Sequence, residues 1–194
     1  SYAILSPPLM NLYLNVLIQG FYDAGTDSRI QDTVKVFLRN SSSPYAIIDT
    51  SISYLDGSGK IGPLNTLFTF SNAVSNVPYY IQVTHRNSIE TWSSSAFSFV
   101  NSELYYAFTD AVTKAYGSNL VQVNTGPVRF ALYGGDVNQD GIIDASDVST
   151  VDNDAYNSLS GYVTSDLNGD DFVDASDLGV VDNNAYNSVS VITP

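Results

Sequence analysis

The chain contains no cysteine, and only one histidine, one methionine and one tryptophan among its 194 residues. The lack of cysteine excludes disulfides, thiol catalysis and zinc sites built on thiolates. The single imidazole, His85, leaves little room for catalysis by histidine or for a metal site with several histidines. Long apolar runs are also missing. The best stretch, residues 9–18, is broken by Asn11 and Asn15 and is shorter than the ~20 residues that span a bilayer.

Basic residues are scarce, with seven Lys and Arg against 20 Asp and Glu, for a net charge of −13. This balance argues against nucleic acid and against membrane insertion or binding to an anionic membrane, because nucleic acids and anionic surfaces attract clustered basic residues. Residues 1–135 carry eight acids and all seven basic residues, whereas residues 136–194 carry twelve Asp and neither Lys nor Arg. Apolar residues recur throughout this acidic segment. We therefore expect it to fold around cations instead of forming a disordered tail.

The acidic segment contains an internal repeat with a period of 30 residues. Residues 136–158 align with residues 166–188 without gaps, and 14 of the 23 positions are identical. Oxygen-bearing side chains occupy loop positions 1, 3, 5, 9 and 12, and position 7 offers its backbone carbonyl. Because calcium takes six to eight oxygens at about 2.3–2.6 Å, the spacing predicts one calcium ion in each loop. The expected ligands are Asp136, Asn138, Asp140, Ile142 (carbonyl), Asp144 and Asp147 in the first loop, and Asp166, Asn168, Asp170, Phe172 (carbonyl), Asp174 and Asp177 in the second.

Two positions depart from the common EF-hand loop. Position 12 is Asp in both copies where Glu is usual. Position 6, where a sharp turn needs a positive φ, is Gly141 in the first loop and Asp171 in the second, so we expect the second site to be more strained or weaker. Apolar residues at helical spacing after each loop predict two short helices that pack together. Three acids beyond the loops hold further calcium or face solvent, and the sequence leaves both readings open: Asp152, Asp154 and Asp182.

Paired loops of this kind, each ending in Asp and each followed by a helix, resemble dockerin modules over about residues 135–188. The resemblance implies folding that depends on calcium and a protein partner, the cohesin domain. Cohesins read dockerins largely at loop positions 10 and 11, which are Ala145-Ser146 and Ala175-Ser176 here. The basic pair that the family carries further along the helix is missing. The resemblance therefore supports calcium binding by this chain more strongly than it supports binding to a cohesin.

The first 134 residues alternate between apolar and polar residues in short runs separated by turn signals, which is typical of β-strands. The sequence predicts an immunoglobulin-like or prealbumin-like β-sandwich over residues 1–134, with an extended N-terminal arm, and a dockerin-like module over residues 135–194. Residues 78–93 resemble a segment of β-sandwich modules that precede dockerin-like repeats in secreted bacterial proteins. The expected strands lie at 12–18, 33–39, 45–55, 64–70, 79–85, 96–100, 103–108, 120–124 and 127–133, and residues 110–116 are expected to be helical with Asp110 as the cap.

The densest polar and aromatic cluster outside the loops is His85, Arg86, Asn87, Glu90 and Trp92. A catalytic site there would need titratable groups held together with shifted pKa values. The alternative is that His85 ends a strand and that Arg86 and Glu90 form a structural ion pair, and this reading is favoured. We predict no catalytic residues and no enzyme. Stacking of sugar rings on the 14 tyrosines stays open.

The leading hypothesis is a secreted, non-catalytic structural protein that binds two calcium ions and assembles outside the cell with copies of itself, as a filament or surface layer. It rests on the apolar N-terminal stretch, residues 1–9, which can add to a neighbour's sheet edge, and on a chain that reads as a processed, exported product. The alternative is a docking or carbohydrate-binding appendage of a secreted hydrolase that binds a cohesin-like partner.

Overall fold

The structure is a computed structural model, and it describes residues 8–55 and 66–194. Residues 1–7 of the arm predicted at 1–9, and residues 64–65 of the run predicted at 64–70, lie outside the described residues. The described strands are β1 (Met10–Asn15), β2 (Tyr22–Asp23), β3 (Ser28–Arg29), β4 (Asp32–Asn40), β5 (Ile47–Leu55), β6 (Thr66–Phe70), β7 (Pro78–His85), β8 (Ser88–Trp92), β9 (Phe97–Ser98), β10 (Glu103–Ala107), β11 (Val121–Thr125) and β12 (Val128–Ala131). The helical elements are the short 3₁₀ turns η1 (Val112–Lys114) and η2 (Tyr116–Ser118) and the α-helices α1 (Ala145–Tyr156) and α2 (Ala175–Tyr186).

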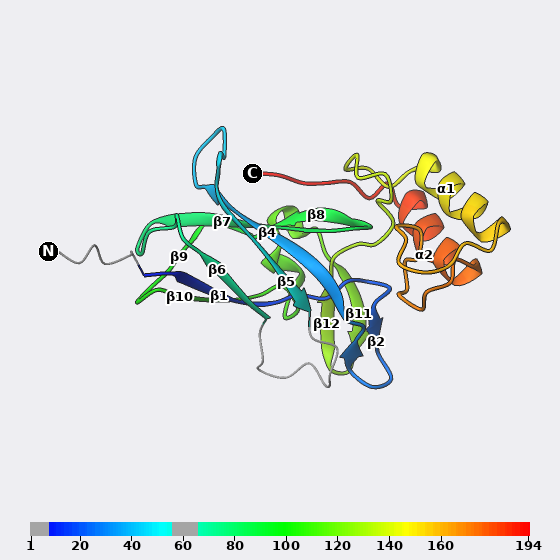
Figure 1. Cartoon of the computed structure of the whole chain (residues 1–194), viewed down its shortest axis with the longest axis horizontal. Coiled ribbons are helices and arrows are strands. Elements are labelled where there is room, and N and C mark those ends of the chain that lie inside the picture. Colours follow the sequence, from blue (N-terminus) through cyan, green and yellow to red (C-terminus); the bar gives the residue numbers. More distant parts are fainter. Residues whose placement is uncertain (1–7, 56–65) are drawn as a thin grey trace, which may run out of the picture.

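Two sheets face each other across the larger part of the molecule (Figure 1). One has the order β5-β4-β7-β8, with β9 also paired to β7, and the other has the order β10-β1-β6. Neighbouring strands are antiparallel except β1 and β10, which run parallel with Leu12 opposite Leu104. The protein is thus a mainly β, sandwich-like fold, which confirms the predicted fold class at that level.

The core of the sandwich follows from the alternation of its strands. In β1 the buried residues are Met10, Leu12 and Leu14, and the residues between them are half-buried. Strands β4, β6 and β7 contribute their own inward-facing residues, such as Phe68 and Ile81, to the same cluster. Because successive side chains of a strand point to opposite faces, this pattern alone determines which face of each strand enters the core.

Most of the predicted strands are present, with ends shifted by a few residues. The helix predicted at residues 110–116 is wrong. The chain forms the 3₁₀ turns η1 and η2 instead, because Ala111 is extended and Gly117 has a positive φ of 62°. Strand β8 was not predicted, since its sequence was read as part of a polar cluster.

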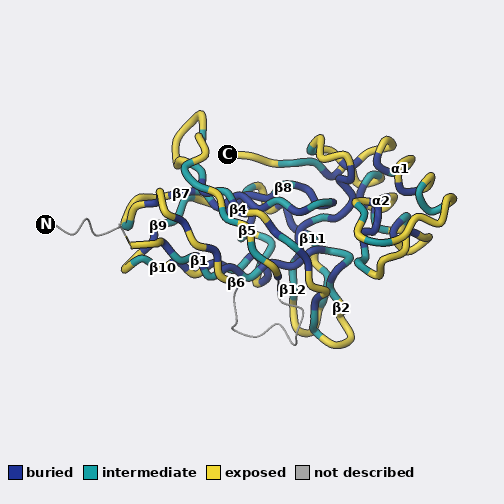
Figure 2. Tube along the Cα trace, viewed as in Figure 1, coloured by how far each residue is buried: buried dark blue, intermediate teal, exposed yellow. Residues whose placement is uncertain are grey.

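The C-terminal segment forms a second cluster of buried apolar residues. Helices α1 and α2 lie together at one end of the molecule (Figure 1), and Val151 and Val181 are fully buried. Ile89 of strand β8 belongs to this second cluster, so the burial in Figure 2 continues from the sandwich into the helical segment. The division of the chain at residues 134 and 135 stays a prediction. No helix in the described part of the chain is long and apolar enough to cross a membrane.

Candidate metal-binding loops and their junction with the sandwich

The first loop is wrapped around two buried carboxylates. Asp136, at position 1, accepts hydrogen bonds from the backbone N–H groups of Asp140 (3.1 Å) and Gly141 (3.2 Å). Asp147, at position 12, accepts from Val137 N–H at 2.9 Å with one oxygen and from Asp144 N–H at 3.1 Å with the other. Both residues are buried, at 3% and 0% exposure. The loop thus places its first and last predicted ligands inside the segment.

The second loop repeats this arrangement at position 12 and alters it at position 1. Asp177 accepts from Leu167 N–H at 2.6 Å and from Asp174 N–H at 2.9 Å, as Asp147 does in the first loop. Asp166 instead accepts from Gly169 N–H at 2.7 Å. The positive φ expected at position 6 is confirmed in both loops, with 86° at Gly141 and 66° at Asp171.

Helix caps complete both loops. Asp144 and Asp174, at position 9, accept from the backbone N–H groups of Ser146 and Ser176. Each forms a capping box with the Asp at position 12 of its own loop. The same side chains therefore serve as predicted ligands and as helix N-caps. This double role explains why loop positions 9 to 12 are identical in the two copies.

Each loop is also held by the segment that follows the opposite helix. Ile143 N–H donates to Val189 O after α2, and Val173 N–H donates to Leu159 O after α1, both at 2.9 Å. The position-7 residues Ile142 and Phe172 are 49% and 63% exposed, while their backbones stay within the loops. The two copies thus form one unit that neither copy can form alone.

Burial sets the electrostatics of the loop carboxylates. Desolvation, followed by the nearby charge of Asp147, raises the pKa of Asp136 to about 6. Desolvation likewise raises the pKa of Asp177. At the exposed rim, hydrogen bonds from Ser146 lower the pKa of Asp144. In the first loop, Asp136 and Asp147 thus bring two buried carboxylates close together.

The donor chemistry of the loops fits a hard cation such as calcium, because carboxylate, amide and carbonyl oxygens are its preferred ligands. Within residues 8–55 and 66–194, no three acidic or histidine side chains converge as a ready metal cluster. Several loop carboxylates bind backbone N–H groups, and Asn138 Nδ2 donates to Asp140 Oδ2 at 2.9 Å. Binding would therefore require some of these side chains to turn. The predicted ligands lie in the right loops without being arranged around one point.

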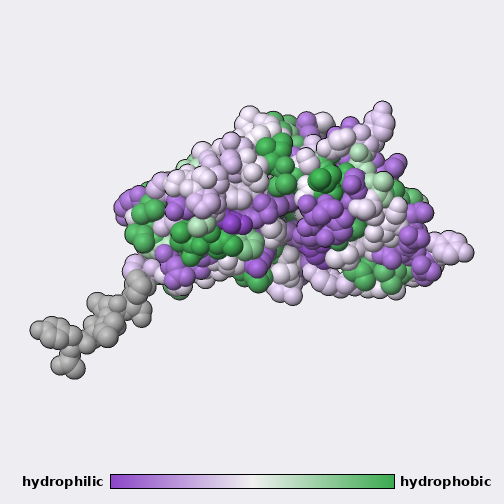
Figure 3. All heavy atoms as spheres, turned by 90° about the horizontal axis from the view of Figure 1, so that it is seen from above, coloured by the Kyte–Doolittle hydropathy of each residue, from purple (hydrophilic) through white to green (hydrophobic). Residues whose placement is uncertain are grey.

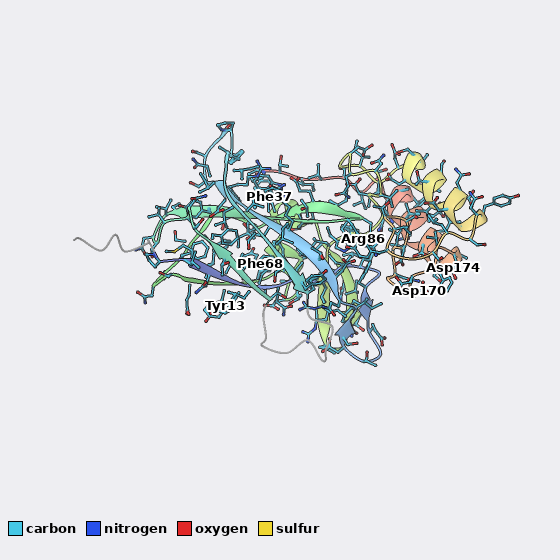
Figure 4. All side chains as sticks on the ribbon, viewed as in Figure 1. Tyr13, Phe37, Phe68, Arg86, Asp170 and Asp174 are labelled. Carbon is cyan, nitrogen blue, oxygen red and sulfur yellow. The ribbon has the colours of Figure 1, made fainter. Side chains whose placement is uncertain are left out.

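A charged network joins the second loop to the sandwich. Arg86, in the turn between β7 and β8, lies between the two parts of the molecule (Figure 4). Its Nε donates to Asp32 Oδ2 at 2.9 Å, and its Nη2 is 3.4 Å from Asp166 Oδ2. The guanidinium also lies over the rings of Phe21 and Tyr162 and donates to the carbonyl of Val163. The predicted ion pair between Arg86 and Glu90 is therefore wrong, because Arg86 pairs with Asp32 and Asp166 instead.

Asp32 is the sandwich residue at the centre of this network. Its Oδ2 lies 3.1 Å from His85 Nε2, and its Oδ1 accepts from Tyr162 Oη at 2.7 Å. Burial would raise the pKa of Asp32, but hydrogen bonds from His85, Tyr162 and Arg86 outweigh it and hold the pKa well below its usual range. His85 is thus a buried structural partner at the end of β7, as the favoured reading expected.

The rest of the polar cluster is also engaged locally. Asn87 Nδ2 donates to Asp166 O at 2.7 Å. Glu90 accepts from Trp92 Nε1 at 2.5 Å. These side chains hold the hairpin and the junction, and the geometry does not pair them as an acid and a base.

Sequence reasoning missed the residues that close the junction from the helical side. Asn184 of α2 is buried and donates to Gln19 Oε1 and to Gly134 O, both at 2.7 Å. The sequence contains one indication of this contact, because the two copies of the repeat differ here, with Asp154 in the first copy and Asn184 in the second. Of the three acids left open by the sequence, Asp152 and Asp182 are exposed and line a groove of about 440 Å³ between α1 and α2.

Comparisons with known proteins give no family. No family model and no curated protein matches the chain. One similar solved structure is the Coh3ScaB-XDoc_M2ScaA complex, a C-terminal interface mutant of a type II cohesin–X-dockerin complex from Acetivibrio cellulolyticus. It has a TM-score of 0.48 and 14% identity, and the match covers 92% of this chain and 95% of that chain. The N-terminal interface mutant of the same complex has a TM-score of 0.44 and 12% identity, with 91% and 92% covered.

These comparisons overturn the assignment to the dockerin family. No family model matches residues 135–188 or any other part of the chain. The same holds for the resemblance of residues 78–93 to modules of secreted bacterial proteins. The loops show why the assignment was wrong, since a repeat of calcium-type spacing defines local chemistry and does not by itself define a family. Scores and identities this low also assign no partner and no activity.

Proposed function

We propose that this chain is a non-catalytic docking module that works outside the cell and whose C-terminal segment is organised by two calcium ions. The observation that carries the proposal is the burial of two carboxylates at the two ends of each loop, with more oxygens from the same loop beside them. Buried carboxylates are costly unless positive charge offsets them, and apart from the contact of Arg86 with Asp166 that charge is left to a divalent cation. No Lys or Arg occurs in residues 136–194 to take that role from within the segment.

The residues of each loop have distinct tasks in this proposal. Calcium would supply two positive charges to each loop and accept oxygen ligands there. Position 1 and position 12 provide the buried carboxylates, and positions 3 and 5, which are exposed except for the half-buried Asn168, add further oxygens. Position 9 stays at the helix start, where Asp144 and Asp174 cap α1 and α2. The loops would in this way hold both helices in a fixed relative orientation.

A protein partner is supported by apolar side chains that the helical segment leaves in solvent. Tyr156 and Tyr186, the last residues of α1 and α2, are 89% and 88% exposed, and Phe172 is 63% exposed. Large exposed aromatic residues are typical of contacts with other proteins. Figure 3 shows apolar residues in separate patches among polar ones on the visible face.

Work outside the cell is supported by the chemistry of the sites. Loops of this type in extracellular modules bind calcium at about 10⁻⁴–10⁻³ M, a range that extracellular calcium reaches.

The first test is the melting temperature of the whole chain with calcium and after chelation. Calcium at about a hundred times its dissociation constant stabilises the folded chain by about 2.7 kcal/mol per site, so two occupied sites should raise the melting temperature by about 10–20 °C. The matched control is the double variant Asp140→Ala, Asp170→Ala, which removes one exposed ligand from each loop and should lose most of this rise. Equal melting temperatures in calcium and chelator would overturn the calcium part of the proposal.

The docking part is tested by sedimentation of the same samples. A monomer in both conditions agrees with a module that docks on a separate protein. Large species that dissociate on chelation would contradict docking and favour assembly with copies of itself.

A further inference from the structure

The two copies of the repeat differ where the second one meets the sandwich. Gly169 stands where the first copy has Gln139, and a Cβ added there would lie 2.6 Å from Phe21 Cε1. Asn184 replaces Asp154 and makes the buried contacts to Gln19 and Gly134 described above. The sandwich therefore explains these differences, and the second loop is the one packed against it.

The β7–β8 hairpin presents opposite charges to the two loops. Arg86, in its turn, places Nη2 3.4 Å from Asp166 Oδ2, and both side chains are largely buried. Asn87 fixes the same residue by donating to its carbonyl. Further along the hairpin, Glu90 of β8 lines a cavity of about 180 Å³ together with Asp136 and Asp140 of the first loop.

We propose that this hairpin makes the two calcium sites unequal, with the first loop binding the ion more tightly than the second. The inference rests on the proposed function, because it concerns the affinity of those same loops. In the second loop the guanidinium of Arg86 already engages one oxygen of Asp166 and competes with a cation for it, although Asp32 offsets part of the charge of Arg86. In the first loop the carboxylate of Glu90 adds negative charge beside the predicted ligands. Asp171 adds a carboxylate to the second loop, but it is exposed, so water screens it.

The test compares two single-loop variants of the full chain. Asp170→Ala leaves only the first loop intact, and Asp140→Ala leaves only the second; both residues occupy position 5 and both are exposed. Calcium affinity is measured by competition with a chromophoric chelator. We expect the first loop to bind about tenfold more tightly, which corresponds to about 1.4 kcal/mol. Equal affinities, or a tighter second loop, would overturn the inference.

Variants that change the charge of Arg86 or Glu90 then test whether these residues cause the unequal calcium affinities. In the Asp140→Ala background, Arg86→Gln should raise the affinity of the second loop about threefold or more, whereas Arg86→Lys, which keeps the charge, should change it less. In the Asp170→Ala background, Glu90→Gln keeps an acceptor for Trp92 and should lower the affinity of the first loop. If Arg86→Gln does not fold, judged by circular dichroism, the Glu90→Gln measurement still decides, and an unchanged affinity there contradicts the inference.

The outcomes separate the two proposals. A wild-type chain that binds no calcium contradicts the proposed function. Two sites that bind calcium with equal affinities, or with affinities indifferent to Arg86 and Glu90, leave that function in place and overturn only the inference about the hairpin.

Discussion

At the scale of single residues, Asp32 shows how the fold gives a role to a residue that the sequence does not mark. It is one of six Asp in the first 135 residues and begins strand β4. In the structure it is 3% exposed and is contacted by His85, Arg86 and Tyr162. Its charge is therefore the counter-charge of a buried cluster at the junction.

We predict that Asp32→Asn destabilises the chain by about 3 kcal/mol at pH 7, since it leaves Arg86 buried without its nearest carboxylate. The pKa of Asp32 is lowered in the folded chain, so its contribution is present above the unfolded pKa of about 3.9 and is lost as the pH falls below it. The stability gap between wild type and variant should narrow below about pH 4. Denaturant unfolding of both chains in chelator, at pH 7 and below about pH 4, measures this difference in unfolding free energy. A difference that grows in acid would contradict the role of Asp32 as a buried counter-charge.

At the scale of elements, the repeat produces two helices, α1 and α2, that have the same N-terminal cap and differ in residues of the helix interior. Both begin with a capping box, which depends only on residues three positions apart. In α2, Gly179 stands where α1 has Ser149, and a Cβ added at Gly179 would meet no atom within 4 Å. Glycine inside a helix has a high conformational entropy in the unfolded chain.

Gly179→Ala should therefore stabilise the chain by about 0.5–1 kcal/mol. The matched control is Ser149→Ala at the same position of α1, where the Ser hydroxyl donates to Ala145 O at 2.7 Å. Its gain should be smaller, because serine disfavours helices less than glycine does. Denaturant midpoints of both variants decide this, and a destabilised Gly179→Ala chain would show that the space beside α2 is used.

At the scale of the whole molecule, the junction determines how the helical segment lies on the sandwich. Gly20 lies in the segment between β1 and β2. It comes so close to the second loop that a Cβ added to it would lie 2.0 Å from Leu167 O. That carbonyl belongs to the backbone and cannot turn aside as a side chain would. Gly20 is required for the close approach itself.

Gly20→Ala should push the second loop away from the sandwich and lower the stability by about 2–4 kcal/mol. The Gly179→Ala chain serves as the control, since it adds the same methyl group in open space. The expected readouts are a lower melting temperature and faster cleavage near residues 162–167 in limited proteolysis. A Gly20→Ala chain as stable as wild type would mean that the junction accommodates the methyl group by a shift of the backbone.

Much of the fold and of the loops was predictable because it depends on neighbours along the chain. The alternation in β1, β4 and β7 determined the faces of the strands, and the oxygen spacing marked both loops and the helices after them. Calcium binding by those loops and the boundary at residue 134 stay predictions. The assignment of the repeat to a family failed, because two short loops carry chemistry and little information on ancestry.

What only the tertiary structure decided is the set of contacts between distant parts of the chain. The partners of Arg86 lie 54 and 80 residues away, and no local pattern indicates them. The 3₁₀ turns at residues 112–118 and the strand β8 likewise follow from packing that outweighs weak local preferences. The sequence by itself determined two loops with the same oxygen spacing and a few different residues. Only the tertiary structure decided that Arg86 and Asn87 of the sandwich contact the second loop, because those contacts join residues far apart along the chain.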